Sequence, residues 1–269
     1  MSSPLNHGDI YFFGEQAKMN GIYLVINAGN TFVTLATFKG HRMNFLSRSL
    51  TSSLSPDLKF GPEFLESRPE LAFISSVVPW IDKTLTKLAA NLTGVPPIWI
   101  TPSSNTGIEI EYSPKDSLGS DRLANAVAAR TIFPHCPVIT VDIGTAINVD
   151  CVTADARYVG GMITPGPGMA AMALKEFTGK LPLVELNQTL GETIGRDTKS
   201  CINSGIILGT AGLIDRLIEE CKESVGKSAK VIATGGGARL VLDFCRNIDT
   251  HDPYLTLKGI YYIGLKNLN

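Results

Sequence analysis

Two stretches of the chain repeat one frame, and this repeat constrains the fold more than any other feature of the sequence. Residues 23–38 read YLVINAGNTFVTLATF, and residues 138–153 read VITVDIGTAINVDCVT. Each contains an apolar strand, a polar residue, one spacer, Gly, then Asn or Thr and a second strand. The polar residue is Asn27 in the first copy and Asp142 in the second, 142 − 27 = 115 residues later. The repeat predicts a duplicated α/β unit.

The rest of the chain alternates strand and helix patterns, as a mixed α/β fold requires. Apolar, β-branched segments predict strands at 42–50, 70–78, 97–100, 156–166 and the start of 230–245. Helical spacing predicts helices at 79–92, 117–133, 196–223 and 254–265, with Ser117 or Ser120 as the cap of the second. We expect two similar domains, each a mixed sheet flanked by helices, with a cleft between them.

The predicted domain boundaries follow the loop composition. Residues 1–20 are interpreted as an extension, residues 21–115 as the first domain and residues 116–269 as the second. The boundary falls in the segment SPKDSL at 113–118, which has the composition of a loop. The C-terminal helix is expected to pack back on the first domain.

Composition excludes several classes of protein. The net charge of −1 and the lack of a dense Lys/Arg run argue against nucleic-acid binding. No apolar stretch approaches the roughly 18 residues that a bilayer span needs, so we expect no membrane association. The N-terminus has no basic start followed by an apolar block, and the five cysteines form no CxxC pair. A cytoplasmic protein with free thiols is the interpretation these features favour.

A glycine turn follows the first strand in each copy of the repeat. A third glycine turn occurs in ATGGGA at 233–238. Backbone amides at such turns can face phosphate oxygens, and a carboxylate at a strand end can hold a cation or its bound water. Any one of these turns is equally typical of an ordinary hairpin, but three in one duplicated layout favour a nucleotide site.

The stretch GSDRLANAVAAR at 119–130 is more specific. One interpretation makes Asp121 a general base that takes a proton from an attacking hydroxyl, while Arg122 holds substrate or phosphate charge. The alternative makes Asp121 a first-turn helix acid favoured by the dipole and Arg122 its solvated partner.

With these motifs together, the chain resembles the type III pantothenate kinases of the sugar kinase/Hsc70/actin-like superfamily. The resemblance runs from about residue 22 to 265. The motifs stand in the family's order: NAGNT, ISSVVP, GSDRLANAVAA, VDIGTA, GGMITPG, TGKLP, IGRDT, SGIILG, ATGGGA and LTLKGI.

The resemblance implies two duplicated ribonuclease H-like (actin-like ATPase) domains and transfer of the ATP γ-phosphate to the primary hydroxyl of pantothenate, the first step of coenzyme A biosynthesis. It implies that Asp121 is the proton acceptor and that Asp142 holds a monovalent cation, K⁺ or NH₄⁺, with ATP and Mg²⁺ also required. It further implies a homodimer whose substrate pocket is completed at the interface. The implied substrate-binding residues are Tyr112, Gly119, Ser120, Arg122 and Thr198, and the implied nucleotide-binding residues are Asn27, Ala28, Gly29, Asn30, Thr31, Phe32, Val33, Thr34 and Thr145.

Ordinary structural roles are the alternative for several of these residues. Tyr112 fits a half-buried loop aromatic, Thr198 a helix N-cap and Thr145 a turn residue.

Asn27 departs from the family, which carries Asp at this position. An amide keeps the shape and one acceptor oxygen but removes the negative charge that a hard cation prefers. The chain is therefore either a working kinase in which Asn27 orients a water, or a catalytically weakened paralogue with a ligand-binding or regulatory role. Asp121, Arg122 and Asp142 are all retained, which favours the working kinase.

Two further alternatives fit the sequence less well. A sugar kinase or a polyphosphate/pppGpp phosphatase of the same superfamily is usually longer and matches GSDR and TGKLP poorly. The near-neutral charge and the lack of a recognisable recognition-helix module argue against a DNA-binding regulator.

Overall fold

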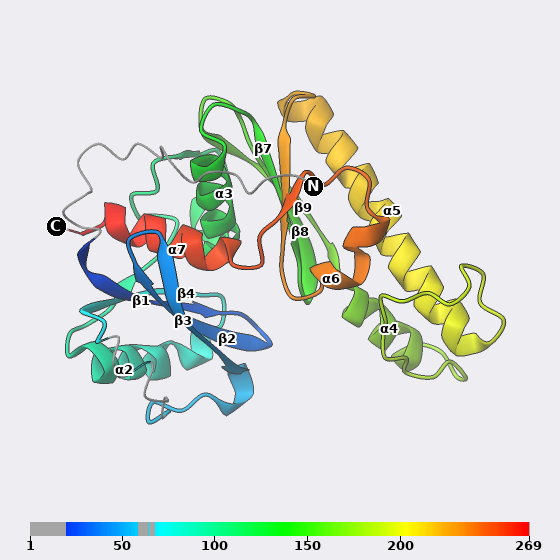
Figure 1. The fold of residues 1–269 in the computed structure, drawn as a ribbon, viewed down its shortest axis with the longest axis horizontal. Helices are drawn as coiled ribbons and strands as arrows, with labels where there is room; N and C mark the ends of the chain where they lie inside the picture. The colour runs from blue at the N-terminus through cyan, green and yellow to red at the C-terminus, as the bar shows by residue number, and fades with distance from the viewer. Residues whose placement is uncertain (1–19, 59–63, 65–67, 269) are drawn as a thin grey trace. The chain divides into compact units, whose positions relative to one another are not determined.

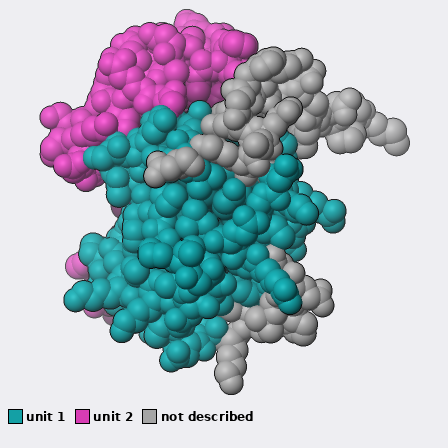
Figure 2. Space-filling model, turned by 90° about the vertical axis from the view of Figure 1, so that its left-hand side faces the viewer, with its two compact units in different colours: residues 1–106, 260–269 teal, residues 107–259 magenta. Residues whose placement is uncertain are grey.

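The computed structural model describes residues 20–58, 64 and 68–268. The predicted extension, apart from residue 20, lies outside the described residues. The chain forms two compact units, one of residues 1–106 with 260–269 and the other of residues 107–259 (Figure 2). The predicted division into domains at 115/116 stays a prediction.

The first unit contains a five-stranded sheet in the order β3-β2-β1-β4-β5 (Figure 1). β1 is antiparallel to β2 and parallel to β4, and β3 is antiparallel to β2. The strands are β1 (Ile22–Ala28), β2 (Phe32–Lys39), β3 (Arg42–Leu50), β4 (Leu71–Ser76) and β5 (Ile98–Trp99); the helices are η2 (Thr51–Ser53), η3 (Pro79–Ile81) and α2 (Asp82–Thr93).

Alternation along the strands gives this sheet two buried faces. Leu24 and Ile26 of β1 share a core with Leu85 and Leu88 of α2. On the other face, aromatic rings pack together: Tyr23 stacks on Phe73 with ring centroids 5.2 Å apart, and Phe38 stacks on Tyr261 at 4.8 Å. Because both faces are covered, β1 is apolar at nearly every position until Asn27.

The second unit contains a six-stranded sheet in the order β11-β10-β7-β8-β9-β6. Its strands are β6 (Glu109–Ile110), β7 (Val138–Ile143), β8 (Ala146–Val152), β9 (Arg157–Pro165), β10 (Lys230–Thr234) and β11 (Thr250–His251). Its helices are η4 (Lys115–Ser117), α3 (Ser120–Ile132), α4 (Pro167–Glu176), α5 (Thr198–Val225), α6 (Ala238–Val241), η5 (Leu242–Phe244) and the first turn of α7 (Leu255–Lys266).

The two sheets repeat one topology, which confirms the predicted duplication. β9-β8-β7-β10-β11 follows the same order as β3-β2-β1-β4-β5, and each antiparallel or parallel pairing is the same in both. β6 is an additional edge strand of the second sheet, parallel to β9. The register places Asn27 opposite Thr34 in one hairpin and Asp142 opposite Asn148 in the other.

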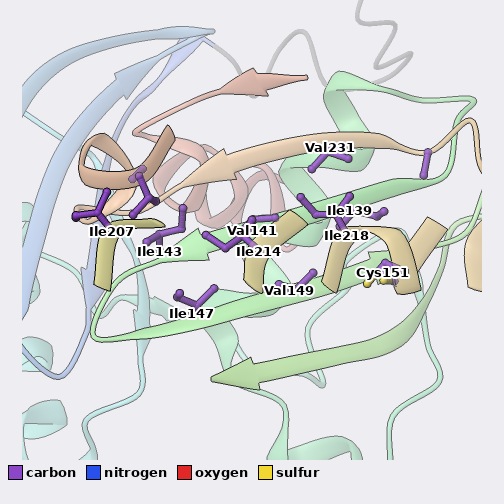
Figure 3. Close-up of a cluster of buried hydrophobic side chains, with 14 residues drawn as sticks. Ile139, Val141, Ile143, Ile147, Val149, Cys151, Ile207, Ile214, Ile218 and Val231 are labelled. Carbon is purple, nitrogen blue, oxygen red and sulfur yellow. The ribbon is translucent and has the colours of Figure 1, made fainter. Parts of the chain in front are cut away.

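Helices cover both faces of the second sheet. The residues at odd positions of β7 and β8 pack against α5 through Ile207, Ile214 and Ile218, as Figure 3 shows. α3 packs against the same two strands. Since side chains alternate, the residues at even positions of β7 and β8, among them Asp142 and Asp150, lie on the sheet face opposite to the α5 core. Asp142 and Asp150 therefore lie on the same face of the sheet.

Three predictions about helices need correction. α3 begins at Ser120 after Gly119, with no side-chain cap, and Ser117 Oγ instead donates to the carbonyl oxygen of Pro114 at 2.7 Å. α5 is capped by Asp197, whose side chain accepts from the backbone of Lys199 and Ser200, so Thr198 is not the N-cap. Gly is itself a favoured residue at the position before a helix, even though it has no side chain to accept a hydrogen bond.

The third correction concerns α5. In the described part of the chain, α5 is long and apolar enough to cross a membrane by length and composition alone. The prediction that no stretch approaches this length is therefore wrong. A core helix of a soluble protein passes the same test, and Ile207, Ile214 and Ile218 of α5 are fully buried in the second core.

Candidate active site

The candidate residues form one group in each unit, and each group is built on the repeated hairpin. In the first unit, the turn after β1 is closed by the amide of Gly29, which donates to the carbonyl of Phe32 at 2.9 Å. Thr51 fixes this turn from η2. Its Oγ1 donates to the carbonyl of Gly29 at 2.7 Å, and its amide donates to the carbonyl of Thr31 at 3.0 Å. The predicted phosphate loop thus has a fixed backbone.

Asn27 lies at the end of β1, beside Thr34 of β2 and Ser75 of β4. Its Oδ1 is buried and accepts no hydrogen bond from the described residues. A buried acceptor without a donor is unfavourable by about 1–3 kcal/mol, so such atoms are rare. The amide oxygen is therefore free to accept from a bound ligand or its water.

In the second unit, Asp142 occupies the matching position and is held by a chain of side chains. Thr256 Oγ1 of α7 donates to Asn125 Oδ1 at 2.8 Å, and Asn125 Nδ2 of α3 donates to Asp142 Oδ2 at 3.1 Å. The first bond fixes which way the Asn125 amide points, and the second fixes one oxygen of Asp142. Asp142 Oδ1 is left for another partner.

Glycines surround this free oxygen. Gly235, in the turn after β10, has φ +94°. A Cβ at Gly235 would lie 2.4 Å from Asp142 Oδ1 and 2.5 Å from the carbonyl oxygen of Ile143. Only glycine allows this turn to approach the end of β7 so closely. The predicted third glycine turn therefore meets the second hairpin.

Asp121 and Asp142 influence each other electrostatically. Burial and, to a smaller extent, the negative charge of Asp121 raise the pKa of Asp142, and the hydrogen bond from Asn125 opposes the rise; the resulting pKa is about 6. Burial also raises the pKa of Asp121, while the hydrogen bond from the Arg122 amide lowers it. Asp121 is half-buried, and its Oδ1 accepts from that amide at 2.8 Å. A carboxylate with a raised pKa is a better proton acceptor than an exposed one.

Arg122 is not the solvated partner that one interpretation of the sequence expected. It is 6% exposed, and its Nε and Nη2 both donate to Oδ1 of Asp150, at 3.0 and 2.6 Å. Tyr158 Oη donates to the same oxygen at 2.6 Å. Asp150 is 1% exposed and was not predicted as a site residue. An aspartate in the apolar strand INVDCV is the sequence signal that could have revealed it.

The other predicted substrate residues lie in two places. Tyr112 is half-buried beside this cluster, with its ring centroid 5.6 Å from Arg122 Cζ, and Gly119 and Ser120 begin α3 next to Asp121. Thr145, the predicted nucleotide contact, is exposed in the turn between β7 and β8, where its carbonyl accepts from the Gly166 amide at 2.9 Å.

Thr198 lies elsewhere in the second unit. It lines an open groove of about 950 Å³ whose lining includes neither Asp121, Arg122 nor Asp142. The groove is formed by α4, the segment before α5 and the start of α5; its lining residues are Ala170, Ala173, Leu174, Leu181, Gly195, Arg196, Asp197, Thr198, Cys201, Ile202, Gly205 and Ile206. Within one chain, the structure thus does not bring Thr198 into the Asp121 cluster.

Comparison with known proteins gives the family. The family model of type III pantothenate kinase matches residues 23–220. A type III pantothenate kinase of Desulfosudis oleivorans is 34% identical over 250 residues, 90% of this chain and 98% of that protein. Another, of Desulfatibacillum aliphaticivorans, is 35% identical over 249 residues, 89% of this chain and 96% of that protein. The chain belongs to the type III pantothenate kinase family.

Solved structures show that the fold extends beyond close relatives of this family. A protein of Campylobacter jejuni described as a Baf family transcriptional activator matches with a TM-score of 0.58 at 18% identity, covering 89% of this chain and 96% of that one. Component A of (R)-2-hydroxyglutaryl-CoA dehydratase from Acidaminococcus fermentans matches with a TM-score of 0.51 at 15% identity, covering 91% and 96%. At these identities the likeness concerns the fold alone, which is the predicted two-domain actin-like fold.

A kinase of this family uses ATP with a divalent metal, and the described residues fit these groups in a particular way. Among residues 20–58, 64 and 68–268, no cluster of three or more His, Cys, Asp or Glu side chains could hold a metal ion. The first unit offers the buried Oδ1 of Asn27, which has no hydrogen-bond partner among the described residues. One neutral oxygen is compatible with Mg²⁺, which keeps several waters and takes its other ligands from phosphates.

Proposed function

We propose that this pantothenate kinase family member transfers the γ-phosphate of ATP to the primary hydroxyl of pantothenate and forms 4'-phosphopantothenate, the first step of coenzyme A biosynthesis. The observation that carries the proposal is the family match across nearly the whole chain, together with the buried carboxylate cluster at the start of α3. The weakened paralogue has no support from the relatives, which are named as kinases.

Asp121 is the proposed general base. As the hydroxyl oxygen bonds to the γ-phosphorus, the bond from that phosphorus to the leaving oxygen breaks, and the hydroxyl proton passes to Asp121. The raised pKa of Asp121 helps, because a more basic carboxylate holds the proton more firmly in the transition state. Tyr112, Gly119, Ser120 and Arg122 bind the substrate next to this carboxylate.

The loop of residues 27–34 is the proposed first phosphate site, with Thr145 as a further nucleotide contact. Bound MgATP supplies the phosphoryl group and neutralises its charge with the metal. With the metal bound, Asn27 Oδ1 would accept a hydrogen bond from a metal-bound water, a role that needs an acceptor oxygen and no charge. An amide at position 27 is therefore compatible with an active kinase.

Asp142 is the proposed ligand of a monovalent cation, K⁺ or NH₄⁺. Asn125 Nδ2 donates to Oδ2, and the Gly235 turn lies so close to Oδ1 that an added Cβ would be 2.4 Å from it. A bound cation would favour the charged form of Asp142 and oppose the burial that raises its pKa to about 6.

We also infer a homodimer in the cytoplasm, with no nucleic-acid or membrane partner. Apolar side chains are exposed along and beside the groove of Thr198: Met169, Met172, Phe177, Ile194 and Leu213. Gly205, Gly209 and Gly212 present bare backbone on α5, where an added Cβ would meet nothing within 4 Å. A second copy of the chain would cover this surface, and its Thr198 would complete the pocket of the first copy.

An ADP-release assay with ATP, Mg²⁺ and K⁺, run with and without pantothenate, tests the proposal. We expect turnover that depends on pantothenate and rises when NH₄⁺ or K⁺ replaces Na⁺. Parallel reactions with a hexose in place of pantothenate test the sugar-kinase alternative. ADP release that is indifferent to pantothenate would overturn the proposed function.

A further inference from the structure

We propose that Asp150 is a positioning residue for the kinase reaction: it holds the Arg122 guanidinium in one orientation, so that the remaining N–H groups of Arg122 face the substrate. The proposal rests on the proposed function, because it concerns how the same site binds pantothenate. Asp150 itself touches no substrate and acts only through Arg122.

The geometry of the pair is one-sided. Arg122 Nε and Nη2 both donate to a single oxygen, Oδ1 of Asp150, and Tyr158 Oη donates to that oxygen as well. A guanidinium carries five N–H groups. Two are committed to Asp150, and a third makes only a long contact of 3.5 Å from Nη1 to Tyr112 Oη. The donors on the Nη1 side are those left for a carboxylate or hydroxyl of the substrate.

Stability does not account for this arrangement. Both side chains are buried, at 6% and 1% exposure, and the desolvation of two buried charges commonly offsets their attraction. The pair also lacks the two parallel bonds of a well-paired Arg and carboxylate. Oδ2 of Asp150 is buried and has no hydrogen-bond partner among the described residues. An ion pair that leaves one oxygen unsatisfied is a poor way to gain stability and an effective way to fix one edge of Arg122.

The elements around the pair explain how it fixes Arg122. Arg122 lies in the first turn of α3, one residue from Asp121, while Asp150 and Tyr158 come from the adjacent strands β8 and β9. Tyr112 lies edge-on to Tyr158 with ring centroids 6.0 Å apart and flanks the guanidinium. A shift of Arg122 would therefore carry its Nη1 donors away from the substrate and weaken substrate binding.

The decisive variant is Asp150→Asn, which keeps the size of the side chain and removes its charge. We expect the KM for pantothenate to rise at least tenfold, while the KM for ATP and kcat stay within about threefold of wild type. Calorimetry with pantothenate should show the same factor in Kd, which is a readout that does not depend on turnover. Arg122→Lys should raise the pantothenate KM as well, and adding Asp150→Asn to it should change little more.

Asp215→Asn is the matched control. Asp215 is also an aspartate of the second unit, but it accepts from the backbone amides of Arg246 and Asn247, at 2.9 and 3.0 Å. The Asp215→Asn variant should lower the midpoint of thermal unfolding but leave the KM for pantothenate and the KM for ATP near their wild-type values. If Asp150→Asn behaves in the same way, or lowers kcat with an unchanged pantothenate KM, the proposal is wrong.

Tyr158→Phe covers the case in which Asp150→Asn does not fold. It removes one bond to Asp150 and keeps the ion pair, so we expect a rise of about threefold in the pantothenate KM alone. An unchanged pantothenate KM in this variant would also overturn the proposal. Failure of the proposed function is distinguishable, since the wild-type protein would then show no turnover with pantothenate.

Discussion

The β1–β2 and β7–β8 hairpins have the same topology but treat their polar residue in opposite ways. Asp142 receives a hydrogen bond from Asn125, and the Gly235 turn lies against its other oxygen. Asn27 has a buried Oδ1 that no described residue contacts with a hydrogen bond. The connections differ too: residues 29–31 join β1 to β2, whereas residues 144 and 145 join β7 to β8.

A carboxylate and an amide therefore need different surroundings at the same backbone position. A buried carboxylate is stabilised by a hydrogen-bond donor, and the side chains of α3 and α7 supply one to Asp142 through Asn125 and Thr256. A neutral amide tolerates one unpartnered oxygen and keeps it free for an external ligand. The carboxylate of the repeat therefore stands in the second unit, where a side chain donates a hydrogen bond to it.

The substitution expected to change activity most is at Asp121, in the unit that carries the buried carboxylates. Asp121→Asn should lower kcat by about 1000-fold, because the loss of a general base removes a factor of roughly 10² to 10⁴. The dissociation constant of ATP, measured by calorimetry, should stay within about threefold, since the base acts on the alcohol. Turnover equal to wild type would remove Asp121 from the reaction.

Asp142 gives the next largest effect, on stability. Its folded pKa of about 6 exceeds the ordinary value of 3.8, so its protonated form is favoured in the folded state. The stability from this group is full below about pH 4 and is lost as the pH rises through 6. A shift of about two pKa units corresponds to about 3 kcal/mol.

Urea unfolding in K⁺-free buffer between pH 4 and 7 measures this effect. Asp142→Asn cannot titrate, so the free energy of unfolding of the wild type should fall relative to the variant by about 3 kcal/mol over that range. Added K⁺ should restore part of the difference in the wild type alone. Parallel curves for the two proteins would show that Asp142 is not shifted.

A substitution at Asn27 tests whether the neutral amide of the first hairpin limits activity. Asn27→Asp restores the family's carboxylate, and we expect either a higher kcat or a Mg²⁺ requirement lowered by about three- to tenfold. The Mg²⁺ dependence of the rate at saturating ATP measures it, with Asn27→Ala as the variant that lacks the oxygen. If the aspartate changes neither quantity, the amide is no handicap.

The smallest effect concerns the support of Asp142. Thr256→Val removes the bond that orients the Asn125 amide, which is worth about 1 kcal/mol. We expect the concentration of K⁺ for half-maximal rate to rise about threefold with kcat nearly unchanged. Thr86→Val is a matched control, because Thr86 Oγ1 only donates to a carbonyl of its own helix. An equal response of the two variants would separate Thr256 from the cation site.

Much of the fold was predictable because it depends on local periodicity. The hairpins, the strand at 42–50, the helix at α5 and the C-terminal helix were all placed correctly, and the identical strand order confirms the duplication. Helix caps were less predictable. Ser117, Ser120 and Thr198 are all good capping residues in isolation, and only the course of the backbone decides which one faces the free amides.

The sequence by itself determined the family, the duplicated α/β unit and the candidate residues Asp121 and Asp142, since these depend on residue type and order along the chain. Only the tertiary structure decided that Arg122 is buried against Asp150, that Asn125 and Thr256 hold Asp142, and that the oxygen of Asn27 is free. These partners lie 28, 17 and 131 residues apart. A hydrogen bond depends on distance and direction in space, and a local pattern specifies neither for residues so far apart in the chain.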